Sequence, residues 1–185
     1  MTMVSEPITM ATDYMLAIAS SIFAILLWRR NARLWAVAFF FTACGSFFGG
    51  TYHGFGGALV WKATVYSIGL ASLFLLMPFL RVVAIVIFIV YAVWMTTHDG
   101  FVWVIADYGV TLLLLTAVMI VHRSPMSRWV ISSVIVSVIA AIVQEAPITY
   151  HNDVYHVIQL VALWLLYRGG AVMSWATVRP RIQPT

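Results

Sequence analysis

Long apolar stretches dominate the chain, and short groups of charged residues, glycine and proline separate them. Seven stretches approach the roughly 20 apolar residues that a helix needs to cross the hydrocarbon core of a bilayer. The predicted spans are residues 11–28, 34–55, 59–79, 82–97, 102–121, 129–146 and 153–175. Only a few residues connect each span to the next. The pattern therefore predicts an all-α protein with a single domain over residues 1–185, a bundle of seven transmembrane helices.

The composition supports a membrane protein. Of the 185 residues, 63% are hydrophobic and only 9% are charged, whereas soluble domains carry about 25% charged residues. A chain of this size has too little interior to hide so much apolar surface from water. The composition excludes a soluble protein, a disordered chain and a nucleic-acid-binding module. The single cysteine, Cys44, excludes a disulfide framework and a cysteine-based zinc site.

The basic residues predict the orientation of the bundle. Seven spans put the two termini on opposite sides of the membrane. Nine of the ten basic residues fall on the side of the C-terminus, and only Lys62 falls on the other: Arg29, Arg30, Arg33, Arg81, Arg123, Arg128, Arg168, Arg179 and Arg181. The positive-inside rule makes that side cytoplasmic and the N-terminal side external. Short loops and small size favour a bacterial inner membrane.

The acidic residues and most histidines gather on the predicted outer side. All six acids fall there: Glu6, Asp13, Asp99, Asp107, Glu145 and Asp153. Four of the five histidines do so too: His53, His98, His151 and His156. We therefore expect the outer third of the bundle to hold nearly all the groups that can bind a metal ion or move a proton.

The second span carries a histidine near its outer end, in the sequence CGSFFGGTYHGF. This residue is His53, and Ser46 lies seven residues earlier, on nearly the same helix face and about 10 Å deeper. Gly45, Gly49 and Gly50 allow a neighbouring helix or a ligand to approach closely. The alternative is a packing helix whose histidine faces water at the headgroups.

The seventh span opens with the polar sequence YHNDVYHVIQL. Asn152 is a suitable N-cap, and Asp153 suits the positive end of the helix dipole. Asn152, His156 and Gln159 share one face because they are spaced i, i+4 and i+7. A polar group such as His156, one turn inside a span, usually faces the bundle interior. His151 precedes the predicted helix and can turn toward the same site from its loop.

The spans and the two histidines resemble the CREST superfamily, which includes alkaline ceramidases, adiponectin-receptor-like receptors and haemolysin-III-like bacterial proteins. The resemblance implies a lipid amide hydrolase that holds zinc between one histidine on the second helix and an H-x-x-x-H pair on the seventh. His53 matches the first of these, and His156 matches the second member of the pair. Asn152 stands in the slot of the first member, with His151 one position earlier.

The resemblance is partial at the accessory residues. Gly49 stands four residues before His53, where the family has serine, and the nearest serine is Ser46. The family's aspartate near the start of the third helix is absent, and Lys62 and Thr64 occupy that region. The acidic start of the chain, with Glu6 and Asp13, is similar in character to the N-terminal region of the ceramidases, which sometimes binds calcium.

The residues predict roles in a zinc-dependent hydrolase. Catalytic zinc sites keep three protein ligands and one open position. His53 and His156 supply two ligands, and the third is His151 or an oxygen of Asp153 or Asn152. Zinc lowers the pKa of its water toward about 7. Asp153 would act as general base.

Two further residues complete the candidate catalytic set. Ser46 would donate a hydrogen bond to the developing oxyanion. Asp107 lies about five residues inside the fifth span, and an intramembrane acid is a functional candidate. It would bond the water on the metal, pair with Lys62 or line a proton path. Alternatively, the span begins later and Asp107 is interfacial.

The leading prediction is thus a zinc-dependent integral membrane hydrolase that acts on a lipid amide or ester, with its site facing the outer side. A CREST-like sensor or receptor that keeps the metal as a structural element is a second prediction. A small proton-coupled transporter that uses Asp107, Glu145 and the histidines is a third. A haem protein with His53 and His156 as axial ligands is a further alternative.

Overall fold

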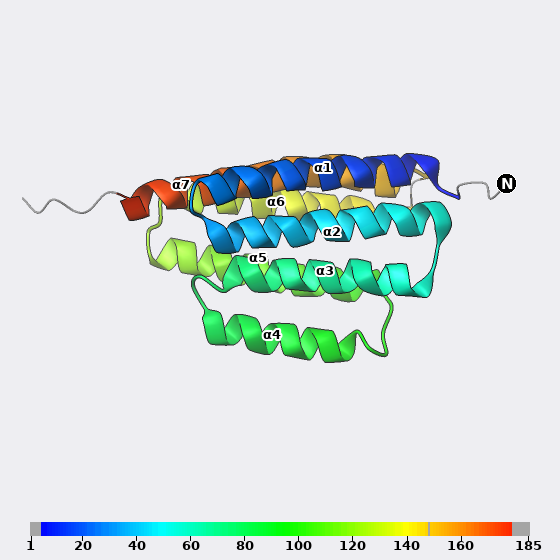
Figure 1. The fold of residues 1–185 in the computed structure, drawn as a ribbon, viewed down its shortest axis with the longest axis horizontal. Helices are drawn as coiled ribbons and strands as arrows, with labels where there is room; N and C mark the ends of the chain where they lie inside the picture. The colour runs from blue at the N-terminus through cyan, green and yellow to red at the C-terminus, as the bar shows by residue number, and fades with distance from the viewer. Residues whose placement is uncertain (1–4, 148, 179–185) are drawn as a thin grey trace, which may run out of the picture.

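The computed structural model describes residues 5–147 and 149–178. Within these residues the chain is all-helical, as predicted, and contains seven helices that run along a common axis (Figure 1). The helices are α1 (Pro7–Arg29), α2 (Arg33–Phe55), α3 (Ala58–Leu76), α4 (Arg81–Trp94), α5 (Phe101–Val121), α6 (Ser127–Gln144) and α7 (His151–Val178).

The helices pack in an order that brings the two ends of the sequence together. α1 packs against both α2 and α7, and α6 packs against α7. α3 contacts α2, α4 and α5, so α4 lies at the edge of the bundle, at the bottom of Figure 1. The largest buried side chains of the core include Trp35, Phe39 and Leu27. This arrangement places the start of α1 beside the start of α7, where the polar residues lie.

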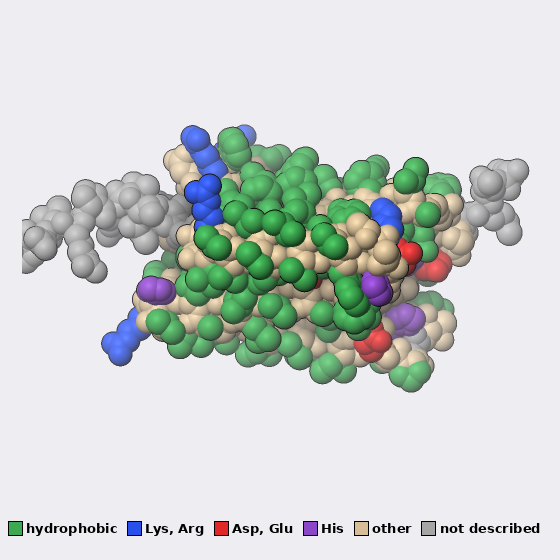
Figure 2. All heavy atoms as spheres, turned by 90° about the horizontal axis from the view of Figure 1, so that it is seen from below, with side chains coloured by type: hydrophobic (Ala, Val, Ile, Leu, Met, Phe, Trp, Pro, Cys, Tyr) green, Lys and Arg blue, Asp and Glu red, His purple; other side chains and the backbone are tan. Residues whose placement is uncertain are grey.

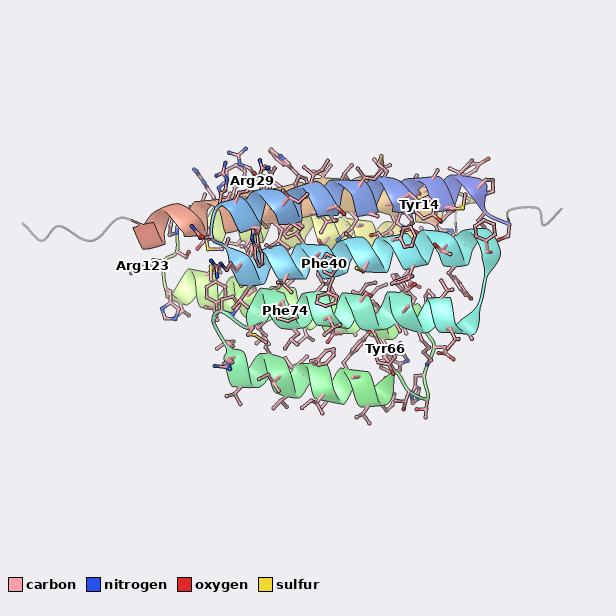
Figure 3. All side chains as sticks on the ribbon, viewed as in Figure 1. Tyr14, Arg29, Phe40, Tyr66, Phe74 and Arg123 are labelled. Carbon is pink, nitrogen blue, oxygen red and sulfur yellow. The ribbon has the colours of Figure 1, made fainter. Side chains whose placement is uncertain are left out.

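Charge separates along the bundle axis. Figure 2 shows arginine and lysine gathered mostly at one end and the acidic side chains at the other, with apolar side chains covering the surface between. Figure 3 places Arg29 and Arg123 at the basic end and Tyr14 toward the other end. Arg179 and Arg181, two of the nine basic residues used to predict orientation, lie outside the described residues.

Five of the described helices are long and apolar enough to cross a membrane, namely α1, α2, α3, α5 and α6. The predicted fourth span, residues 82–97, extends three residues beyond the end of the helix in the structure, α4, at Trp94. α4 has 14 residues and a length of about 21 Å. It ends at Trp94 because the amides of Thr97 and His98 both bond to the carbonyl of Trp94 and form a turn.

The starts of α1 and α7 also differ from the prediction. α1 begins at Pro7, four residues earlier, and proline suits the first turn of a helix because its missing N–H needs no partner there. α7 begins at His151, so His151 is not in a loop and Asn152 is not an N-cap. The Asn152 side chain instead accepts a hydrogen bond from Gln144 Nε2 at 2.8 Å, which ties α6 to α7.

Candidate functional site

A cavity of about 370 Å³ lies inside the bundle between α1, α2, α3, α5, α6 and α7. Its polar lining comes mainly from residues near the acidic end, and its deeper lining is apolar. The polar lining residues include Asp13, Ser46, His53, Gln144, Asn152, Tyr155, His156 and Gln159, and the apolar ones include Leu16, Ile68, Val104, Leu112, Val134 and Leu163. As the i, i+4, i+7 spacing predicts, Asn152, His156 and Gln159 face the same space.

His156 is the most enclosed histidine of this cavity, with 7% of its surface exposed. Its Nδ1 lies 2.9 Å from Thr12 Oγ1. The Thr12 hydroxyl already donates its proton to the carbonyl of Thr9, so it accepts from Nδ1–H of the imidazole. In the neutral ring, Nε2 therefore carries a lone pair. Nε2 faces Asp13 Oδ1 at 3.3 Å.

Asp13 approaches His156 because α2 has two glycines where α1 crosses it. A β-carbon at Gly49 would lie 3.3 Å from Asp13 Oδ2. One at Gly50 would lie 2.9 Å from a ring carbon of Tyr14 and 3.0 Å from the carbonyl oxygen of Met10. The prediction that these glycines allow close approach is confirmed, and the neighbouring helix is α1. Asp13 is only 6% exposed.

His53 lines the same cavity from α2 and is oriented by Glu6, the residue at the N-cap of α1. Its Nδ1 lies 2.8 Å from Glu6 Oε2, and the backbone N–H of Glu6 donates to the carbonyl oxygen of His53 at 3.2 Å. An ionised carboxylate only accepts hydrogen bonds, so Nδ1 of His53 is the donor and Nε2 carries the lone pair. Nδ1 of both histidines is thus engaged, that of His156 by Thr12 on α1 and that of His53 by Glu6 at the N-cap of α1, which leaves Nε2 as the acceptor.

The predicted general base, Asp153, does not line the cavity. Its Oδ1 accepts a hydrogen bond from Thr9 Oγ1 at 2.8 Å, which joins α7 to α1. The carboxylate beside His156 is Asp13, from the opposite end of the sequence. His151 is likewise absent from the cavity lining. Ser46 lines the cavity on the same helix as His53, as predicted.

Asp107 lies elsewhere. It is buried, with 8% exposed, and it lines a separate small void with Gly69, Ser72 and Thr111 that has no room for a water molecule. Its Oδ2 has no hydrogen-bond partner within the described residues. Lys62, one predicted partner of Asp107, pairs instead with Asp99 at 2.6 Å.

The donor chemistry of the cavity suits a metal ion in part. No three His, Cys, Asp or Glu side chains are close enough together to enclose an ion, within the part of the chain that the structure describes. His156 Nε2 and Asp13 Oδ1 lie 3.3 Å apart, and two ligands of a tetrahedral zinc ion are separated by about the same distance. A charge-assisted hydrogen bond would be shorter, about 2.7–2.9 Å.

Asp13 is not among the site residues predicted from the sequence. An acid inside an apolar helix is a functional candidate by default, and this rule could have identified Asp13. The predicted first span begins at residue 11, however, and so places Asp13 at the opening of the helix and not inside it. The helix begins at Pro7, so Asp13 lies in its second turn.

Comparison with known proteins gives one match. A sequence model of a protein family matches residues 8–174, from the second residue of α1 to the last part of α7. The chain belongs to DUF6962, a family of unknown function. No curated protein matches the chain, and no solved structure matches it. The match spans all seven helices of this DUF6962 protein, so the residues of the cavity lie within the family's common region. The resemblance to the CREST superfamily stays a prediction.

Proposed function

We propose that this protein is a metal-dependent integral membrane hydrolase that cleaves an amide or ester bond in a lipid. The observation that carries the proposal is the matched orientation of two histidines, His53 and His156. Each presents an Nε2 lone pair in one cavity, and each has Nδ1 held by a partner on α1 or at its N-cap. Histidines that bind metals almost always donate their other ring N–H to such a partner.

In this proposal His156 and Asp13 are the first two ligands and His53 is the third. The earlier candidate for the third ligand, His151, lies outside the cavity lining. Two histidines and one carboxylate form a known class of catalytic zinc site with an open fourth position. His53 would complete the set through a movement of its side chain within the cavity that it lines.

A bound zinc ion would polarise the scissile carbonyl and lower the pKa of a water molecule toward about 7. The other residues would orient the metal ligands and stabilise the negative charge that develops on the substrate. Glu6 and Thr12 fix the two imidazole rings through Nδ1. Ser46 would donate a hydrogen bond to the developing oxyanion.

The cavity lining supports a lipid substrate. Below the polar end it is formed by aliphatic side chains of five helices. Leu113 and Val138 line the cavity and are also exposed on the outer surface of α5 and α6. Gly109, on the same stretch of α5, has open space where a β-carbon would stand. An acyl chain would enter here from the bilayer.

The proposal includes seven membrane crossings, with the N-terminus outside and the cavity's polar end at the outer face. The arginines that the described part of the chain holds at the opposite end (Figure 2) support this orientation. Short loops favour a bacterial inner membrane as the location.

The first test is metal analysis of the protein purified in detergent. We expect about one equivalent of zinc in the unchanged protein and a loss of at least tenfold in zinc affinity in His156→Ala and His53→Ala. His98→Ala is the matched control, because His98 lies at the same end but stacks on Trp94 outside the cavity. Absence of bound metal in the unchanged protein would refute the proposal.

The second test is hydrolysis of a fluorogenic long-chain amide and a matching ester in detergent micelles. We expect activity that a chelator removes, that added zinc restores and that His156→Ala lacks. Bound metal without hydrolysis of either substrate would favour the sensor or receptor. Proton flux into liposomes by metal-free protein would favour the transporter, for which the buried Asp13–His156 pair is the supporting observation.

A further inference from the structure

The basic end of the bundle contains a cluster in which two arginines share one indole ring. The guanidinium carbon of Arg128, on α6, lies 5.1 Å from the ring centre of Trp129. That of Arg168, on α7, lies 4.4 Å from the same ring centre and 5.3 Å from the ring centre of Trp164. The two indoles meet edge to face at 6.2 Å. We call these four residues the Arg–Trp cluster.

The two positive charges of the Arg–Trp cluster have no acidic counterpart. Because both guanidinium groups lie over one ring, they are within roughly 10 Å of each other, about the screening length at 0.1 M salt. The nearest acid after Arg128 in the sequence is Glu145, at the far end of α6, which follows Arg128 by 17 residues, or about 25 Å. No described acidic side chain forms an ion pair with either arginine. The cluster therefore concentrates positive charge that nothing in the described protein neutralises.

The surroundings of the cluster suit a lipid headgroup. Both arginines are exposed, and Trp164 and Val161 on the same helix expose apolar surface beside them. Tryptophan collects at the interface between headgroups and acyl chains. A molecule bound here would meet cations at one end and apolar surface at the other, as a phospholipid requires.

The two arginines have the donor chemistry that a phosphate group requires. Planar guanidinium groups bind phosphate through two parallel hydrogen bonds. Stacking on an aromatic face pre-orients arginine for such recognition.

We propose that the Arg–Trp cluster is a binding site for the phosphate headgroup of an anionic phospholipid. The site lies at the end of the bundle opposite the polar end of the cavity, and it is independent of the proposed hydrolase activity. Basic pockets between transmembrane helices are a recurring way of binding anionic headgroups.

The test is a titration of the full chain, delipidated in detergent, with phosphatidylglycerol, phosphatidylcholine or inorganic phosphate, with binding followed by native mass spectrometry. We expect saturable binding of one phosphatidylglycerol and weaker binding of the other two. Arg128→Gln with Arg168→Gln should weaken phosphatidylglycerol binding about thirtyfold, the factor expected for two basic residues near an anionic surface.

Two control variants make the test specific. Arg29→Gln with Arg30→Gln removes the same charge at the same end, from exposed arginines where α1 ends, and should leave binding within about threefold of the unchanged protein. Arg128→Lys with Arg168→Lys keeps the charge but loses the planar donor fork, and should weaken binding by less than the glutamine pair. Circular dichroism checks that each variant folds.

Three outcomes would overturn the proposal. Equal weakening by both glutamine pairs would show that only the total charge matters. Equal binding of phosphatidylcholine would exclude selection for an anionic lipid. Equal binding of inorganic phosphate would identify a free-anion site instead of a lipid site.

Discussion

Two carboxylates are buried inside the bundle, and their surroundings differ. Asp13, on α1, faces His156 Nε2 at 3.3 Å and lines a cavity of about 370 Å³. Asp107, on α5, lines a void too small for water, and one of its oxygens has no partner within the described residues. Both are less than a tenth exposed. Burial alone therefore does not distinguish a reactive carboxylate; space for a ligand and a partner of complementary chemistry do.

The largest expected effect is on metal binding. Asp13→Asn removes one proposed ligand while it keeps the size of the side chain. We expect zinc affinity to fall at least hundredfold, whereas Asp107→Asn should leave it unchanged. Equilibrium dialysis against a metal buffer measures both. If the two variants lose zinc equally, the distinction between the two carboxylates is wrong.

A smaller effect is expected at the residue that orients His53. Glu6→Gln still accepts a hydrogen bond from Nδ1 but no longer carries a charge. We expect a 10- to 100-fold loss of zinc affinity, the range typical of a metal site's outer partners. The same dialysis assay applies, with Asp99→Gln as control, since Asp99 is an exposed acid at the same end that pairs with Lys62. An unchanged zinc affinity in Glu6→Gln would show that His53 is not a metal ligand.

The third prediction applies one apolar substitution to both carboxylates. Asp107→Leu should raise the free energy of unfolding by about 1 kcal/mol, because it removes a buried oxygen that lacks a partner. Asp13→Leu should lower it by about 1–3 kcal/mol, since its side chain meets the close-packed Gly49 of α2. Denaturant unfolding in mixed micelles, followed by circular dichroism, gives both values. A destabilised Asp107→Leu would show that Asp107 has a structural role.

The smallest expected effect concerns the region of Asp107. Tyr91, on α4, donates a buried hydrogen bond from its hydroxyl to the carbonyl of Val65 at 2.9 Å. Tyr91→Phe should lower the free energy of unfolding by about 1 kcal/mol. Zinc affinity should not change, because α4 contributes no residue to the cavity lining. Loss of zinc affinity in Tyr91→Phe would show that the region around Asp107 influences the metal site in the cavity.

The sequence predicts the helices well where a charged residue or a glycine marks their ends. The second, fifth and sixth helices begin within two residues of the predicted positions, next to Arg33, Gly100 and Arg128. The shared face of His156 and Gln159 was also predictable, because polar residues are rare in this helix and their spacing fixes the face. Helical periodicity therefore located half of the site.

The other half depends on helix pairing, which the sequence does not display. α1 is apolar around most of its circumference, so no stripe indicates which face packs inward. The pairing of α1 with α7 brings Asp13 to His156 across 143 positions of sequence, and no local pattern encodes that contact. The end of α4 was missed for a different reason: Met95 continues the apolar run while the backbone already turns.

The short α4 has a consequence for the surrounding lipid. Its 14 residues reach about 21 Å, while the hydrocarbon core of a bilayer is about 30 Å thick. Its outward side chains, including Val82, Val90 and Val93, are exposed and apolar. If α4 crosses the membrane as we propose, this hydrophobic mismatch makes the lipids beside it compress or draws its polar turns below the headgroups. The bundle would then favour thin regions of membrane and gather short-chain lipids along this one edge.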